Sequence, residues 1–163
     1  MKKVNSKGFT LIELLIVIAL IAVIAGATFV ALDPLTRFKD SRDARRWSDV
    51  ASILSAIKID QVDNKGAYLP AIDLAASGTV LMIANGTVGS GCDTDCDAVA
   101  AADDCVDLSG LVTNGKLGVL PISPKSNGDW AANITGYTLI KTAAGAITIA
   151  ACEGENSVIS VTR

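Results

Sequence analysis

The fold of this chain is decided by the stretch KGFTLIE at residues 7–13 and by the apolar run that it opens. The run continues to Leu32, and Glu13 is its only charged residue. As a helix it is about 36 Å long, which is enough to span the hydrocarbon core of a membrane with some tilt. Lys2, Lys3 and Lys7 precede it without an acidic residue, so we expect the N-terminal side to stay cytoplasmic.

The apolar run is expected to remain in the mature protein. A secretory peptidase normally cuts behind such a run, at a pattern of small residues like A-x-A. No good site of that kind follows Leu32, whereas the small residue Gly8 lies in front of the run. The sequence therefore predicts a retained, single-pass membrane helix over residues 9–32.

The residues around Gly8 and Phe9 resemble a known signal. A basic leader, this Gly-Phe pair, the spaced Glu13 and a full-length apolar span together resemble the class III signal of type IV pilins and type II secretion pseudopilins. The resemblance implies that a membrane-bound prepilin peptidase cuts after Gly8 and methylates the new N-terminus at Phe9. Residues 1–8 are then a leader peptide that is removed, and Glu13 becomes the fifth residue of the mature chain.

Glu13 needs an explanation, because an unpaired carboxylate near the end of a membrane helix costs about 1–3 kcal/mol. One interpretation is a snorkelling side chain at the cytoplasmic interface. The other is an ion pair with the amine that cleavage creates at Phe9, formed within one chain or between neighbouring subunits. The resemblance favours the pair between neighbours, which gives Phe9 and Glu13 a role in assembly.

The helix is expected to kink between Gly26 and Pro34, because glycine weakens a helix and proline removes a backbone donor and restricts Asp33. Residues 35–47 beyond it carry charges around most of the helix circumference. Opposite charges lie four residues apart at three places: Asp33/Arg37, Lys39/Asp43 and Arg45/Asp49. We interpret this segment as a solvated helix. The interleaved acids oppose the alternative that its arginines bind phosphate.

An apolar face follows the charged segment. Apolar residues recur there at spacings of three and four: Trp47, Val50, Leu54 and Ile57. This pattern predicts a helix that packs one face on a head domain. We expect it to close at residues 63–66, where Asn64 or Gly66 can take the left-handed conformation. The pattern Asn-x-Gly-x-Tyr-x-Pro at residues 64–70 again resembles pilins and small pseudopilins.

Residues 66–163 are predicted to form the globular head. One short strand is expected at residues 80–84, and the rest of 71–126 is interpreted as loop with a short helix near 99–111. The C-terminal part contains three β-prone segments separated by turn residues: 137–142, 146–152 and 157–162. We expect an antiparallel sheet whose inner face covers the helix, which makes the fold class α+β and the arrangement pilin-like.

The composition argues against several kinds of site. The chain has no histidine, which removes His-based triads and His metal ligands. Its net charge of −3 becomes more negative once the leader lysines leave, so nucleic-acid binding is not indicated. The sequence also lacks a phosphate loop and a base for a Ser or Cys nucleophile. We therefore do not expect an enzyme.

Four cysteines lie beyond the membrane run: Cys92, Cys96, Cys105 and Cys152. An even number on the outer side of the membrane predicts two disulfides. Four cysteines allow three pairings, and spacing does not choose among them. We favour one link inside residues 92–105 and one from this loop to Cys152.

The same loop is acidic. Its aspartates fall at positions one, three, five and twelve of a calcium-loop template: Asp93, Asp95, Asp97 and Asp104. However, Ala98 stands where that turn needs glycine, Asp104 is shorter than the usual glutamate, and Cys96 lies inside the loop. We favour a solvated loop pinned by disulfides and expect no cofactor, with calcium as the alternative.

Three functions compete for such a chain. The one we favour is a structural subunit, a major or minor pilin, of a type IV pilus-like surface filament whose hydrophobic N-terminal helices pack together after cleavage. The second is a pseudopilin of a type II secretion system. The third is a single-pass anchored head domain that does not polymerise. The resemblance implies as partners further copies of the chain, the prepilin peptidase and N-methyltransferase, and a pilus or secretion assembly platform.

The expected organisation has four segments. They are a leader at 1–8, a membrane and polymerisation helix at 9–32, its amphipathic continuation at 33–65, and a disulfide-bonded head at 66–163. Before assembly we expect the chain in the inner, cytoplasmic membrane with its N-terminus in the cytoplasm. After assembly we expect it in an extracellular pilus or in a filament within the periplasm or envelope.

Overall fold

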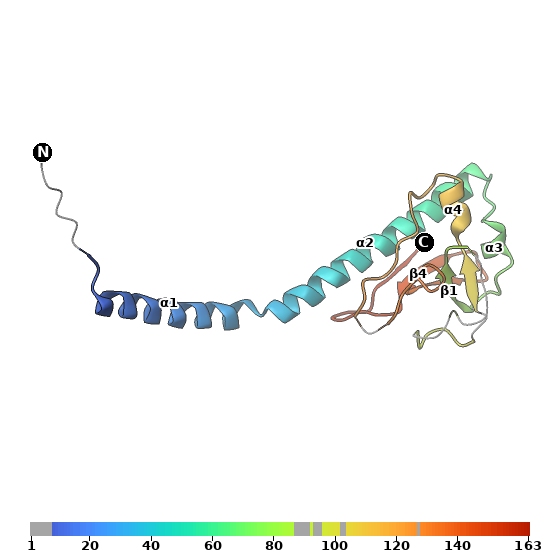
Figure 1. Ribbon diagram of the computed structural model, residues 1–163. Coiled ribbons are helices and arrows are strands. Elements are labelled where there is room, and N and C mark those ends of the chain that lie inside the picture. The colour runs from blue at the N-terminus through green and yellow to red at the C-terminus, as the bar shows by residue number, and fades with distance from the viewer. Residues whose placement is uncertain (1–7, 87–91, 93–95, 102–103, 127) are drawn as a thin grey trace, which may run out of the picture. The chain divides into compact units, whose positions relative to one another are not determined.

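The structure is a computed structural model that describes residues 8–86, 92, 96–101, 104–126 and 128–163. The chain divides into two units, residues 1–38 and 39–163. Figure 1 shows the order of the elements along the chain.

The first unit contains helix α1, Leu11–Leu32. The helix runs without interruption through Gly26, the first residue of the range in which a kink was expected. The interruption falls at the far end of that range, at Asp33, whose φ of 37° is left-handed, and helix α2 begins directly after it at Pro34. A residue before proline is driven out of the helical conformation, whereas proline itself fits the first position of a helix. The local chemistry of Asp33-Pro34 is therefore sufficient to separate the two helices.

Helix α2, Pro34–Asp63, supplies one layer of the second unit. The inner face of its later part is buried and almost wholly apolar: Val50, Ile53, Leu54, Ala56 and Ile57. Trp47, which the pattern placed on that face, lies at its edge and is 42% exposed. The helix ends as expected near Gly66, which has a φ of 97°, but Lys65 and not Asn64 is the second left-handed residue.

The second layer is a five-stranded sheet with strand order β2-β1-β3-β4-β5. Its strands are β1 Val80–Ala84, β2 Cys105–Asp107, β3 Tyr137–Lys141, β4 Ile147–Ala151 and β5 Ser160–Thr162. The last three form the antiparallel meander predicted from the sequence, and β1 joins it antiparallel to β3. The α+β prediction of a helix packed on a mostly antiparallel sheet is confirmed.

The segment between β1 and β3 differs from expectation. Residues 105–107 form strand β2, which pairs parallel with β1, inside the region where a short helix was predicted. The helix that does form, α4 at Ser109–Thr113, starts later, and a second short helix, α3, spans Pro70–Asp73. Leu108 donates from its backbone N–H to the carbonyl of Ala84, so pairing with β1 continues up to the start of α4. A parallel partner far along the chain leaves no local pattern, which is why β2 was missed.

The sheet has an apolar cluster on each face because successive side chains along a strand point to opposite sides. One cluster includes Leu81, Ile83, Leu139 and Ile149 and packs against the inner face of α2. The other is centred on Met82 and Trp130 and includes the cysteines. Figure 1 shows α2 lying along the sheet. Most of α2 thus belongs to the same unit as the sheet, and that unit begins at Lys39.

Candidate functional site

The first candidate site lies where α1 begins. Gly8, Phe9 and Thr10 are in neither helix nor strand, and helical structure starts at Leu11. Thr10 is the N-cap residue, with an extended backbone at φ −81° and ψ 152°. Phe9 is 86% exposed. The Gly8-Phe9 bond expected to be cut therefore precedes the helix.

Thr10 and Glu13 form a reciprocal capping box. The Glu13 backbone N–H donates to Thr10 Oγ1 at 3.3 Å, while both the backbone N–H and the hydroxyl of Thr10 donate to Glu13 Oε2 at 2.8 Å. Such a box satisfies donors that a helix start otherwise leaves unpaired. The partner that the sequence demanded for Glu13 is, in this subunit, Thr10. Sequence reasoning missed this role, although Thr-x-x-Glu ahead of an apolar run is the pattern that signals it.

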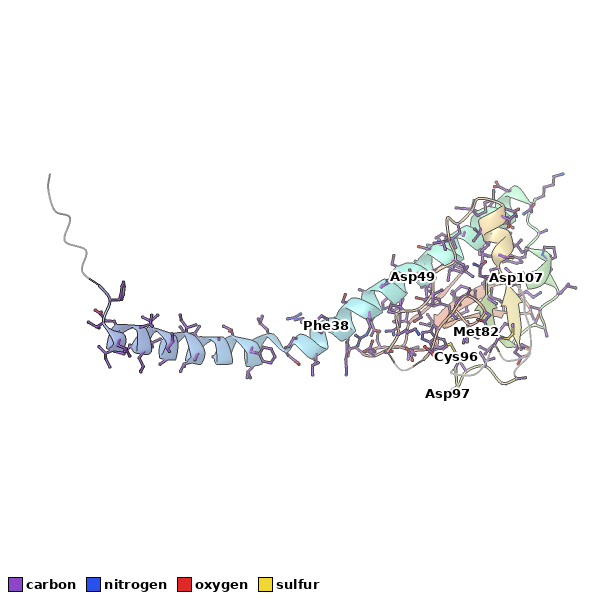
Figure 2. The ribbon with its side chains drawn as sticks, in the orientation of Figure 1. Phe38, Asp49, Met82, Cys96, Asp97 and Asp107 are labelled. Carbon is purple, nitrogen blue, oxygen red and sulfur yellow. A yellow bond between two sulfur atoms is a disulfide. The ribbon has the colours of Figure 1, made fainter. Side chains whose placement is uncertain are left out.

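Helix α1 exposes apolar side chains on every side. None of its residues is buried, and Figure 2 shows the side chains projecting all around the helix. Among the described residues, one helical stretch, beginning at Leu11, is long and apolar enough to cross a membrane. A helix that is apolar all round requires either lipid or other apolar helices around it. The exposed apolar surface of α1 therefore fits anchoring in a membrane.

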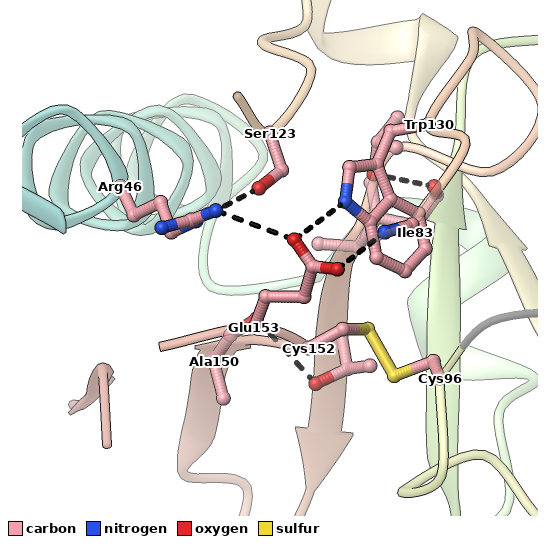
Figure 3. Close-up of a disulfide and its surroundings, with 11 residues drawn as sticks. Arg46, Ile83, Cys96, Ser123, Trp130, Ala150, Cys152 and Glu153 are labelled. Atoms are coloured by element: carbon pink, nitrogen blue, oxygen red, sulfur yellow. Dashed lines mark hydrogen bonds and ion pairs between the residues drawn. A yellow bond between two sulfur atoms is a disulfide. The ribbon is translucent and has the colours of Figure 1, made fainter. Parts of the chain in front are cut away.

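The second candidate site is buried in the head and was not foreseen. Arg46 on α2 is 0% exposed. Its Nη1 lies 2.8 Å from Asp43 Oδ1 and 3.1 Å from Glu155 Oε1, and its Nη2 lies 3.3 Å from Glu153 Oε2. We call these four residues the Arg46 cluster. Figure 3 shows the Glu153 carboxylate between Arg46 and the indole of Trp130, which donates to it from Nε1 at 3.3 Å.

Neutral groups complete the coordination of the Arg46 guanidinium. Nε donates to the Ser123 hydroxyl at 3.1 Å, and Nη2 donates to the Pro124 carbonyl at 2.9 Å and to the Ser126 hydroxyl at 3.0 Å. Within the described part of the chain, every buried side-chain nitrogen or oxygen has a hydrogen-bond partner. A planar guanidinium with several fixed donors suits such a buried role, whereas an ammonium does not.

The cluster holds the loop after β4 against α2. Arg42 reaches the same loop and donates from Nε and Nη2 to the two carboxylate oxygens of Glu155. The hydrogen bond from Arg42, reinforced by Arg46, lowers the pKa of Glu155 to about 2. Burial raises the pKa of Asp43, but the backbone N–H groups of Glu155 and Asn156 and the Arg46 guanidinium outweigh it and keep that pKa below its ordinary value.

The three expected charge pairs on this segment have different outcomes. Arg45 and Asp49 do approach each other, with Nε and Oδ2 3.9 Å apart. Asp43 instead pairs with Arg46, and Asp33 accepts a hydrogen bond from the Thr36 hydroxyl at 2.6 Å. The segment was interpreted as solvated because its partners, Glu153 and Glu155, lie more than a hundred residues away. Arg42 and Arg46 bind carboxylates of the head. The cluster therefore has a structural role, because it holds the loop after β4 on α2.

The cysteines form two pairs in the head. Cys92 pairs with Cys105 and Cys96 with Cys152, with Cα–Cα distances of 6.2 and 5.3 Å. Both distances lie in the range that disulfides require. This connectivity matches the one preferred from the sequence. Because Cys152 directly precedes Glu153, the second disulfide and the Arg46 cluster hold the same loop (Figure 3).

Two of the calcium candidates, Asp93 and Asp95, lie outside the described residues. Asp97 is exposed beside Cys96, and Asp104 is half-buried with its backbone carbonyl accepting from Met82 at 2.8 Å. Over the described ranges, no three acidic, Cys or His side chains converge in a way that could hold a metal. The calcium alternative therefore gains no geometric support from this part of the chain.

Comparison with known proteins gives one match. Residues 3–29 match the family described as Prokaryotic N-terminal methylation motif. This motif is the hallmark of the prepilin-type cleavage site of type IV pilins and pseudopilins, and it covers Gly8, Phe9, Thr10 and Glu13. No curated protein and no solved structure matches the chain. The motif supports a type IV pilin-like or pseudopilin protein.

Proposed function

We propose that this protein is a structural subunit, a major or minor pilin, of a type IV pilus-like surface filament. The observation that carries the proposal is the pairing of the methylation motif with α1, a helix that buries none of its residues within the chain. Assembly follows removal of residues 1–8 by a prepilin peptidase, and the α1 helices of successive subunits then pack side by side.

The apolar surface of α1 has to stay out of water both before and after assembly. Each fully buried Leu, Ile, Val or Phe side chain is worth about 1.5–3 kcal/mol relative to exposure in water. Before assembly, the inner membrane supplies the apolar surroundings, and afterwards neighbouring α1 helices supply them. Transfer from lipid to a helix bundle keeps the apolar surface dry throughout, so packing and polar pairing decide which state is favoured.

Glu13 supplies the polar pairing. Cleavage leaves a positive amine at Phe9, just over one helical turn from Glu13. In the subunit the Glu13 carboxylate is satisfied by Thr10, through one backbone and one hydroxyl donor. In the filament it pairs with the Phe9 amine of a neighbour, because a charge buried in a bundle is costly unless it has an opposite partner. This pair sets the register of one subunit on the next.

The head faces outward and makes the filament surface. Its partners are further copies of the chain in contacts that do not close, which give an open helical polymer. The peptidase, its methyltransferase activity and an assembly platform act on the chain while it is in the membrane. We assign it no catalytic role, no cofactor and no binding of nucleic acid.

A pseudopilin of a type II secretion system uses the same helix packing in a short, periplasmic polymer. An anchored head domain that does not polymerise has the same membrane helix as these two filament subunits, but its helices do not pack into a filament. Electron microscopy of producing cells separates the three. We expect surface filaments that shear off and contain this chain, with an intact mass that begins at an N-methylated Phe9. Filaments confined to the envelope favour the pseudopilin, and processed chain without any filament contradicts both polymers.

A further inference from the structure

The bond that the peptidase must cut lies just outside the helix. The chain is neither helical nor in a strand at Gly8 and Phe9, and Thr10 has the extended ψ of 152° that ends helical geometry. Peptidases bind their substrates in extended form and act best on segments without regular structure. The position at which α1 begins therefore decides whether the Gly8-Phe9 bond has a conformation that can be cut.

The capping box fixes that position. Thr10 accepts from the Glu13 N–H through its hydroxyl, and Glu13 returns to the Thr10 N–H and hydroxyl. Without the Thr10 side chain, the next residues upstream, Phe9 and Gly8, offer no side-chain oxygen to cap a helix. An apolar environment rewards each further backbone hydrogen bond. The helix is then free to extend through the bond to be cut.

We propose that Thr10 is a positioning residue for leader removal, which stops α1 short of the Gly8-Phe9 bond and keeps this bond extended for the peptidase. The inference rests on the proposed function, because it takes a prepilin peptidase as the partner. In the reaction, water adds across the Gly8-Phe9 amide, the C–N bond breaks, and Gly8 retains a carboxylate while Phe9 leaves as a protonated amine.

Gly8 has a separate role. A Cβ added to Gly8 meets nothing within 4 Å. The backbone of the chain therefore accommodates alanine at this position. Any demand for glycine there comes from the peptidase pocket. Thr10 determines where α1 begins, whereas Gly8 determines how the chain fits the peptidase pocket. Experiments can therefore distinguish the effects of the two residues.

The test measures cleavage of the full-length precursor in detergent micelles by a purified prepilin peptidase. We expect Thr10→Ala to lower kcat/KM about fivefold, in keeping with the usual effect of losing an N-cap, and Thr10→Ser to restore it. Glu13→Gln should stay within about twofold of wild type, because glutamine also completes a capping box. Thr28→Ala is the matched control: it removes a hydroxyl that donates to the Ala25 carbonyl at 2.9 Å, far from the cap.

A conformational readout accompanies the kinetics. In micelles, the Cα chemical shift of Phe9 should move towards helical values in Thr10→Ala and stay unchanged in Thr10→Ser. If the wild-type precursor is cleaved after Gly8 and Thr10→Ala is cleaved at the same rate, this inference is overturned and the proposed function still stands. Slower cleavage without a helical shift at Phe9 also overturns it, since the peptidase then reads the threonine side chain itself. A wild-type precursor that is not cut after Gly8 overturns both.

Discussion

At the scale of single residues, Arg46 is the most informative side chain in the head. A fully buried guanidinium is costly to bring out of water, and its attraction to three carboxylates is what offsets that cost. Removing it leaves Asp43, Glu153 and Glu155 as buried or half-buried acids close together. The residue thus fixes where the loop after β4 lies on α2.

Replacing Arg46 by alanine should lower the free energy of unfolding by about 3–5 kcal/mol, the usual cost of breaking a buried ion pair from one side. Arg45→Ala is the neighbouring control. Its side chain is 67% exposed and approaches Asp49 only at 3.9 Å, so we expect a change of about 0–1 kcal/mol. Denaturant unfolding followed by the intrinsic fluorescence of Trp47 and Trp130 measures both. Equal, small effects would show that the Arg46 cluster contributes little.

Glu155 gives the head a predictable acid sensitivity. Its pKa is lowered from an ordinary 4.5 to about 2, chiefly by the hydrogen bond from Arg42. A carboxyl whose folded pKa is depressed stabilises the fold above its unfolded pKa, and this stabilisation disappears as the pH falls through the folded pKa. Between pH 4.5 and 2 the melting temperature of the wild type should therefore fall more steeply than that of Glu155→Gln. Parallel curves over that interval would contradict the assignment.

At the scale of elements, two devices hold the loop after β4. One is the Arg46 cluster and the other is the disulfide from Cys96 to Cys152, which closes a separation of 56 residues. The disulfide from Cys92 to Cys105 closes only 13. Longer closed loops lose more entropy in the unfolded chain. The two disulfides should therefore contribute differently to the free energy of unfolding, the longer loop contributing more.

Replacing both Cys96 and Cys152 by serine should cost about 4 kcal/mol, against about 3 kcal/mol for the pair Cys92 and Cys105, in the chain-entropy description. Denaturant unfolding of the two double variants measures the difference. Peptide mapping of the non-reduced protein checks the connectivity itself. Any other pairing, or alkylation of all four thiols in the native protein, would refute it.

The elements also show which parts of the structure are readable from sequence. Helix α1 and the β3–β5 meander were predictable because apolar runs and β-prone segments are local patterns. Strand β2 was not, because its register with β1 depends on residues far away in the chain. The Arg46 cluster was also missed, because its partners are distant in the sequence and because a charged stretch of helix normally indicates exposure to solvent. The motif at Gly8 and Glu13 was predictable from the sequence. The capping role of Thr10 was missed, although the Thr-x-x-Glu pattern at the helix start indicates it.

At the scale of the whole molecule, the chain combines two different parts. In the described residues of the head, buried polar side-chain atoms have hydrogen-bond partners, whereas helix α1 leaves its apolar side chains exposed. The head has a core, two disulfides and a buried polar cluster, all internal to residues 39–163. Helix α1 has no buried residue. The motif over residues 3–29 adds a processing signal to that helix. The proposed polymerisation through α1 would account for both properties together.

The most direct test of this account is the filament yield of the Glu13→Gln variant, measured by shearing cells and imaging the sheared fraction. Glutamine keeps the capping contact to the Thr10 N–H but removes the charge that we propose to pair with the Phe9 amine of a neighbour. We expect leader cleavage and membrane insertion as in wild type, with processed subunits accumulating in the membrane and at least about a tenfold loss of filaments, the equivalent of ~1.4 kcal/mol per subunit contact. Wild-type filament yield from Glu13→Gln would contradict the account.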